Sequence, residues 1–390
     1  MSDKESVFVY VPCGPFGVMP NEKTVYRGPN THCRSEGYWM LAVALNMARH
    51  GHQVTIGEYP WGNAIDYPIP ENVSFQPNSG NNEYSGKYDI YISMGWEDTY
   101  APLRCKNIDA HIYVHGWGGN PRGSTFLDYA KKHNLKNHYL ANAPGTRCFY
   151  NLFRTFDYGI YMPYPVVSKI QEKGNFHSRK TLWGNRGAFN PGYKFKSLKL
   201  LDFMEKYPDY LHTVLLYDDI KQRCLFEKNF YGDGIGGKEG AWIVNRFEHL
   251  PNKRLLDTYQ GLPHDEFLRE LNQSKLLLAN GQPACHPQTV DAICMGAIPV
   301  IWNDGDNHFK HIPKDDSVYD INQLDERDKN YRYVNVEFGI NGTDGLDNIM
   351  NDEDLYQKYY TALREVSLDH EYDTAYDIFM SEIRKKEEKL

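Results

Sequence analysis

The chain alternates between apolar runs of strand length and amphipathic stretches of helix length. The first series opens with the apolar run 7–11, fit for a buried parallel strand, and continues with 37–50, where apolar residues recur at helical spacing. Gly51 follows as the expected end of that helix. The same patterns predict strands at 53–56, 88–94, 111–115 and 139–142, and a helix over 124–133.

A second series begins after a polar, proline-containing stretch. It predicts strands at 181–183, 212–217, 255–259, 275–279 and 298–302, with helices at 194–206, 218–226, 265–273 and 287–295. Regular alternation of strands and helices is typical of α/β layering around a parallel sheet. Two such series predict two Rossmann-like domains that face a central cleft, where ligands usually bind.

The length of 390 residues also favours two domains over one. We expect an N-terminal Rossmann-like domain at 1–165, a linker at 166–180 and a C-terminal Rossmann-like domain at 181–365. Residues 366–390 are expected to form a C-terminal helix, which could cross back to the first domain.

Charge is distributed unevenly along the chain. The net charge is −8, yet residues 101–200 hold 16 Lys and Arg against four Asp and Glu, a balance of +12. The other residues therefore carry −20. A basic middle favours an anionic partner such as a sugar-nucleotide phosphate, a nucleic acid or an acidic glycan or lipid surface, although a solvated basic face would look the same.

Targeting and metal signals are absent from the sequence pattern. The start of the chain has no secretory pattern, and no apolar run reaches the length of about 18 residues that a membrane span needs. The seven cysteines are scattered without zinc-site spacing. We therefore expect a reduced, cytoplasmic protein with no structural metal.

The strongest chemical signal is the stretch HPQTVDAICMGAIPVIWN at 286–303. Pro287 suits the first position of a helix, which would leave the backbone N–H groups of Gln288 and Thr289 free to bind an anion such as a pyrophosphate. Asp291 would lie about one turn inside, where it could accept hydrogen bonds from ribose hydroxyls. An ordinary β-α-β unit with no ligand would show the same pattern.

This stretch resembles the donor-site signature of retaining GT-B glycosyltransferases of the family 4 type. The likeness lies in the Gly-Ala-Ile-Pro-Val run that begins at Gly296 and in the acid Asp291, five residues before that glycine. Residues 259–280 and 35–56 also resemble that family, so the likeness covers both series. It implies the GT-B fold.

One subgroup, the T-even phage DNA α-glucosyltransferases, resembles the chain in further short segments. These are the Gly-to-Trp ending at 296–302, Phe230-Tyr231-Gly232, Asp202-Phe203 and the strand ending Tyr113-Val114-His115. The matches suggest a relative of that subgroup.

The resemblance implies roles for individual residues. His115, at the end of an apolar strand, would touch the transferred sugar near its reacting carbon. Arg186 would clamp the donor phosphates, as a planar guanidinium can. A lysine expected five residues later is replaced by Pro191, so Lys194 or Lys196 would have to substitute.

The remaining expected site residues border the nucleotide and the acceptor. Gly261 and Leu262 would lie beside the base, and Glu36 and Gly37 at the start of the first helix would face the acceptor. Many members carry an acid eight residues before the position of Asp291, but position 283 is proline here, so the sugar contacts are expected from backbone amides, Cys285 or His286. No metal and no separate cofactor are expected.

The resulting hypothesis is an enzyme that moves a sugar from a UDP- or GDP-linked donor to an acceptor hydroxyl, with retention. The acceptor would be a glycan, a lipid or a small molecule. One alternative is a phage or viral DNA glycosyltransferase acting on a hydroxymethylated pyrimidine, in the host cytoplasm. A sugar-nucleotide epimerase of the same fold and a non-catalytic sugar-nucleotide sensor are the others.

Overall fold

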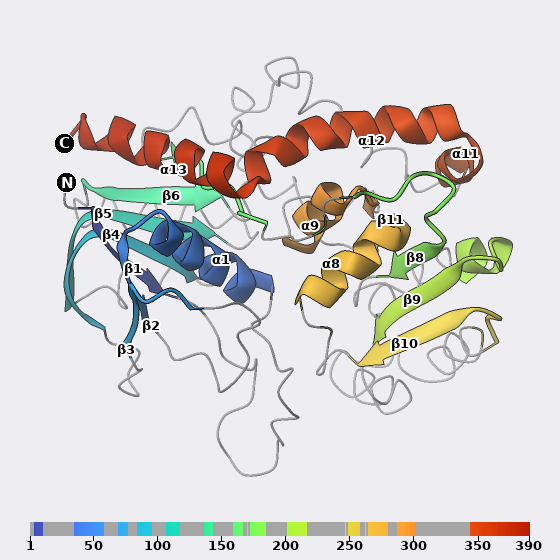
Figure 1. Ribbon diagram of the computed structural model, residues 1–390, viewed down its shortest axis with the longest axis horizontal. Coiled ribbons are helices and arrows are strands. Elements are labelled where there is room, and N and C mark those ends of the chain that lie inside the picture. The colour runs from blue at the N-terminus through green and yellow to red at the C-terminus, as the bar shows by residue number, and fades with distance from the viewer. Residues whose placement is uncertain are drawn as a thin grey trace, which may run out of the picture.

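The structure is a computed structural model of the 390-residue chain (Figure 1). The residues that it describes are 4–10, 35–57, 69–76, 84–95, 107–117, 136–142, 159–166, 170, 172–184, 201–216, 246, 249–257, 262, 264–279, 287–301 and 344–390. The helices expected at 124–133 and 218–226 lie outside these residues, as does most of the helix expected at 194–206.

The first half forms a parallel sheet of seven strands in the order β3-β2-β1-β4-β5-β6-β7. The strands are β1 (Ser6–Tyr10), β2 (Gln53–Gly57), β3 (Val73–Gln76), β4 (Ser85–Gly95), β5 (Asn107–Trp117), β6 (His138–Asn142) and β7 (Gly159–Ile160). The strand order reverses between β1 and β4, which is the point where ligands enter such sheets. Two of these strands, β3 and β7, were not expected from the sequence.

The second half repeats this topology in a five-stranded parallel sheet with the order β10-β9-β8-β11-β12. Its strands are β8 (Thr181–Gly184), β9 (Leu211–Leu216), β10 (Lys253–Asp257), β11 (Ser274–Ala279) and β12 (Ile298–Ile301). Helix α8 (His264–Gln273) joins β10 to β11, and α9 (Pro287–Met295) joins β11 to β12. The expected α/β class with two Rossmann-like sheets is confirmed.

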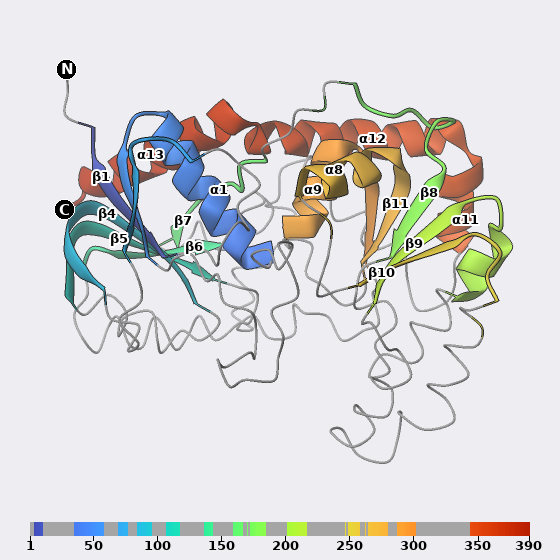
Figure 2. The ribbon, with the colours of Figure 1, turned by 60° about the horizontal axis from the view of Figure 1, so that its bottom comes forward.

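Helix α1 (Ser35–Arg49) brings the two halves together. Its apolar residues Leu41 and Leu45 are buried in one hydrophobic core that also contains residues of α8 and α9. Gly51 ends the turn after α1 with a φ of 94°, a value that glycine adopts without strain, and β2 starts two residues later. Helix α1 contacts α9 directly, and Figure 2 shows these helices between the two sheets.

The C-terminal helices span both halves (Figure 1). Helices α11 (Asp344–Asn351) and α12 (Glu353–Ser367) lie on the second half, where α12 packs against α9 and β12. After the short 3-10 turn η6 (Leu368–His370), α13 (Tyr372–Glu387) packs against α1 and β7 of the first half. Asn46 of α1 donates to the Tyr372 carbonyl at 2.9 Å, which fixes this crossing.

No helix among the described residues is both long and apolar enough to cross a membrane.

Candidate functional site

Helix α9 occupies the residues expected from the sequence, Pro287 to Met295. Gly296 ends it with a φ of 81°, and its N–H donates to the Ile293 carbonyl at 3.0 Å. A Cβ at this position would lie 2.5 Å from the Tyr360 ring and 2.6 Å from Nη2 of Arg179. Glycine is therefore required both by the backbone conformation and by the lack of space.

Arg179 holds the C-terminal ends of α8 and α9 together. Its side chain is fully buried and donates to four backbone carbonyls. The acceptors are Gly174 at 3.0 Å, Leu271 at 3.2 Å, Ser274 at 2.7 Å and Met295 at 2.8 Å. A cation is favourable at helix C-termini, where carbonyls without helical partners gather. Burial lowers the pKa of this guanidinium.

The opposite ends of the two helices lie at the carboxyl edge of the second sheet, because each helix runs back along the strands that it connects. The first residues of α9 present backbone N–H groups that have no partner within the helix. Gln288, the second residue, is half-buried. Such a helix start is a ready site for a phosphate or another anion.

Asp291 lies one turn inside α9 and is only 2% exposed. Its Oδ2 is 3.2 Å from Nε2 of His264, the first residue of α8, which is 5% exposed. Its other oxygen, Oδ1, has no hydrogen-bond partner in the part of the chain that the structure describes. A buried carboxylate oxygen without a donor is costly, so this atom is suited to accept a hydrogen bond from a ligand.

The connection between the two sheets also reaches this site. The Tyr164 hydroxyl lies 3.3 Å from the same Nε2 of His264. The Tyr164 carbonyl accepts a hydrogen bond from Nδ1 of His370 in η6 at 2.9 Å, and the N–H of Val166 donates to the His370 carbonyl at 3.0 Å. The segment after β7 is thus held between the start of α8 and the crossing of the C-terminal helices.

Sequence reasoning did not find His264, Tyr164 or Arg179. One local signal pointed to His264, because it opens the helix after Pro263 and so lies at the carboxyl edge of the sheet. Tyr164 and Arg179 carry no comparable signal.

His115 lies in β5 and is 2% exposed. Its Nδ1 is 3.0 Å from Oγ of Ser93 and its Nε2 is 2.9 Å from Nδ1 of His138. Its ring lies parallel to the rings of Tyr113 and His138. Burial is the main cause that holds the pKa of His115 well below 6.5. Both ring nitrogens of His115 thus lie within hydrogen-bonding distance of protein side chains, and the contact of His115 with a sugar stays a prediction.

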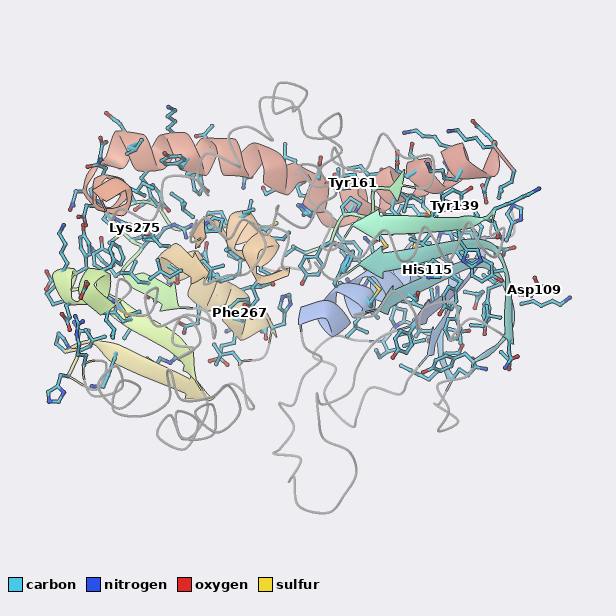
Figure 3. All side chains as sticks on the ribbon, turned by 180° about the vertical axis from the view of Figure 1, so that it is seen from behind. Asp109, His115, Tyr139, Tyr161, Phe267 and Lys275 are labelled. Atoms are coloured by element: carbon cyan, nitrogen blue, oxygen red, sulfur yellow. The ribbon has the colours of Figure 1, made fainter. Side chains whose placement is uncertain are left out.

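Figure 3 places His115 within the first sheet, on the side of the molecule away from Phe267 of α8. Ser93, Tyr113 and His115 share one face of the sheet because side chains alternate along a strand. The apolar residues between them, such as Ile92 and Val114, face the core that contains α1. The sequence pattern placed His115 at the end of a strand, but it did not predict on which face of the sheet the side chain lies.

The structure describes only some of the other expected site residues. Leu262 packs partly buried against the main core. Glu36, Gly37 and Thr289 belong to the first turns of α1 and α9, and only their backbone is described. Arg186, Lys194, Gly261 and His286 lie outside the described residues. Among the residues that are described, no group of three or more His, Cys, Asp or Glu could hold a metal ion.

No protein-family model matches the sequence, and no curated protein matches it. Solved structures do match. AviGT4, a glycosyltransferase involved in avilamycin A biosynthesis, superposes with a TM-score of 0.54 at 11% identity, over 98% of this chain and 97% of that chain. The calicheamicin glycosyltransferase CalG4 gives a TM-score of 0.46 at 11% identity, over 98% and 99% of the two chains.

A TarM variant from S. aureus, in complex with fondaparinux, alpha-GlcNAc-glycerol and UDP, gives a TM-score of 0.44 at 12% identity. That match covers 75% of this chain and 55% of the TarM chain. The likeness to AviGT4 extends over nearly the full length of both chains, and both sheets take part in it. The chain therefore has the α/β GT-B fold, with two parallel Rossmann-like sheets.

Proposed function

We propose that this chain is a glycosyltransferase that moves a sugar from a nucleoside-diphosphate sugar to an acceptor hydroxyl, with retention. The observation that carries the proposal is the buried Asp291, whose Oδ1 has no donor among the described residues, one turn inside a helix that starts at the carboxyl edge of the sheet. A ribose hydroxyl supplies the missing donor, and the helix start suits the diphosphate. The GT-B fold supports this class of reaction.

In this reaction the bond between the anomeric carbon and the diphosphate oxygen breaks, the acceptor oxygen bonds to that carbon, and the hydroxyl proton of the acceptor passes to the departing diphosphate. Negative charge grows on the departing diphosphate. The amides of Gln288 and Thr289 at the start of α9 oppose that charge without having to reorganise. Arg186 and Lys194 are proposed to add positive charge there, and Gly261 and Leu262 to border the base.

The first half is proposed to present the acceptor. Helix α1 contacts α9, and Glu36 and Gly37 at the start of α1 are proposed to face the acceptor. His115 and His286 are proposed to contact the sugar. The acceptor classes kept in this proposal are a glycan, a lipid and a small molecule.

The test pairs two Asp-to-Asn variants. D291N should raise the Kd for UDP or GDP about 10–100-fold, because a charged hydrogen-bond acceptor is lost. D265N is the matched control. Asp265 follows His264 in the sequence, but its side chain is exposed and pairs with Arg269. D265N should bind like the wild type. Isothermal titration with each nucleoside diphosphate measures the affinities.

Turnover decides the reaction class. Mass spectrometry of products from a panel of UDP- and GDP-sugars should show donor consumption only when an acceptor hydroxyl is present. An epimerised donor in reactions without acceptor would instead identify an epimerase, and binding without any turnover would identify a sensor. Equal nucleotide affinity in D291N and D265N would contradict the placement of the ribose at Asp291.

A second candidate is transfer to a hydroxymethylated base in DNA, favoured by the +12 balance of residues 101–200. A base in a duplex would have to be flipped out to reach the cleft. Binding of hydroxymethylated DNA should then weaken steeply between 50 and 200 mM salt, by about 10³-fold for six phosphate contacts. Salt-independent acceptor binding would exclude this candidate.

A further inference from the structure

The contact between His264 and Asp291 decides how the carboxylate is oriented. A carboxylate only accepts hydrogen bonds, so the contact at 3.2 Å is favourable when Nε2 of His264 carries the proton. The terminal torsion of an aspartate is broad and would otherwise leave the two oxygens free to exchange places. Because His264 holds Oδ2, the oxygen that faces away from it is Oδ1.

The same N–H also faces Tyr164, in the segment that follows β7 and connects the two sheets. Nε2 lies 3.3 Å from the Tyr164 hydroxyl and 3.2 Å from Oδ2 of Asp291, so one donor serves two oxygens. All three side chains are buried. The position of the imidazole is therefore set from the second half by α8 and from the connecting segment by Tyr164.

Tyr164 in turn is fixed by the C-terminal crossing. Since a carbonyl only accepts, Nδ1 of His370 carries the proton that it donates to the Tyr164 carbonyl at 2.9 Å. His370 is fully buried in η6, between the helix that covers the second half and the helix that covers the first. The connecting segment, the crossing turn and the start of α8 thus meet at one buried point.

We propose that His264 is a positioning residue for Asp291, and that Tyr164 and His264 couple nucleotide binding at Asp291 to the segment that joins the two halves. This inference rests on the proposed nucleotide site. Any displacement of the connecting segment moves the Tyr164 hydroxyl, and with it the shared N–H that orients the carboxylate. Binding of a ribose hydroxyl to Oδ1 favours the arrangement in which that N–H is in place.

The first experiment compares two amide variants of His264 by titration with UDP and with GDP. The amide nitrogen of glutamine reaches about as far as Nε2 of histidine, whereas that of asparagine stops short. H264Q should bind within about threefold of the wild type, and H264N should bind about tenfold more weakly. Thermal melting of both variants shows whether they are equally folded.

The second experiment uses a matched pair of tyrosines in the connecting segment. Y164F removes the hydroxyl that faces His264, whereas Y161F removes the one that donates to Asp369 at 3.2 Å. Figure 3 shows Tyr161 beside the C-terminal helices. Y164F should raise the Kd for UDP about three- to tenfold, and Y161F should leave it unchanged.

A double-mutant cycle tests whether Tyr164 acts through the carboxylate. In the D291N background, Y164F should have no further effect on the Kd, because its route to the ligand is already lost. Additive effects of Y164F and D291N would overturn the coupling, and equal Kd values for H264Q and H264N would overturn the positioning role. If the wild type binds neither nucleotide, the proposed function fails instead.

Discussion

The polar groups at the two ends of helices α8 and α9 differ in how completely they are hydrogen-bonded. At the C-terminal ends, Arg179 donates to four backbone carbonyls. At the N-terminal ends, His264 serves one oxygen of Asp291 and leaves Oδ1 without a donor in the described part of the chain. Buried polar groups are normally paired. The paired C-terminal ends therefore hold the two helices together, and the incomplete N-terminal ends are where we propose that a ligand binds.

The first half of the molecule also contains buried polar side chains that pair with one another, whereas Oδ1 of Asp291 in the second half has no donor among the residues that the structure describes. The first sheet has its own buried polar cluster, made of Ser93, His115 and His138. Two neutral rings, each with one N–H and one bare nitrogen, satisfy that arrangement within the protein. Changes in the completed clusters should therefore affect stability, whereas changes at Asp291 should affect ligand affinity.

The largest effect is expected from Arg179→Met. It removes the donor from four buried carbonyls, so the free energy of unfolding should fall by about 3–5 kcal/mol. Urea denaturation followed by circular dichroism measures this change. Arg269→Met is the control, because Arg269 is exposed and its pair with Asp265 is worth less than about 1 kcal/mol. A similar fall in the free energy of unfolding in both variants would contradict the special role of Arg179 at the C-terminal ends of the helices.

The next effect is a dependence of stability on pH in the first sheet. Burial lowers the pKa of His138 from 6.5 to about 4. The unfolded chain then binds more protons than the folded chain between these two values. The contribution of His138 to the free energy of unfolding is therefore complete above pH 6.5. It falls by about 3 kcal/mol as the pH drops toward 4.

The variant H138F tests the origin of that dependence. A phenylalanine can keep the stacking on Tyr113, where the ring centroids are 4.2 Å apart, and it does not titrate. Denaturation of H138F from pH 7 to pH 4 should therefore show a flatter loss of stability than the wild type. An unchanged slope would mean that the buried cluster does not control the acid sensitivity.

The smallest effect is expected from His115→Phe. The change breaks two hydrogen bonds and should lower the free energy of unfolding by about 1–2 kcal/mol, with no change in the Kd for UDP. Titration with a UDP-sugar beside UDP sharpens the result. If only the UDP-sugar binds more weakly to H115F, the proposed contact between His115 and the sugar is supported. Equal affinities would leave His115 as part of the internal cluster alone.

The sequence predicted the fold class and most of the strands and helices that the structure describes, because parallel strands buried on both faces appear as short apolar runs. Helix α9 shows the reason most clearly, since Pro287 and Gly296 mark its two ends by local backbone chemistry. Strands β3 and β7 were missed because they are short and carry few apolar residues in a row.

The site could be predicted only where its residues are neighbours in sequence. Asp291 follows from the helix start four residues before it. Its partner His264 is 27 residues away, Tyr164 lies a further 100 residues from that histidine, and Arg179 reaches the Met295 carbonyl across 116 residues. Such contacts depend on strand order and on the crossing of the C-terminal helices, which no local pattern encodes.

The crossing of the C-terminal helices has a consequence for synthesis of the chain. A ribosome releases both sheets before it releases α13, yet α13 covers part of the first half. There the ring of His52, just before β2, lies 2.8 Å from the Tyr376 hydroxyl. The first half is therefore made with that surface uncovered, and the surface stays uncovered until α13 has been made. Nascent chains stopped before Tyr372 would expose the side of α1 and β7 to which α13 normally binds.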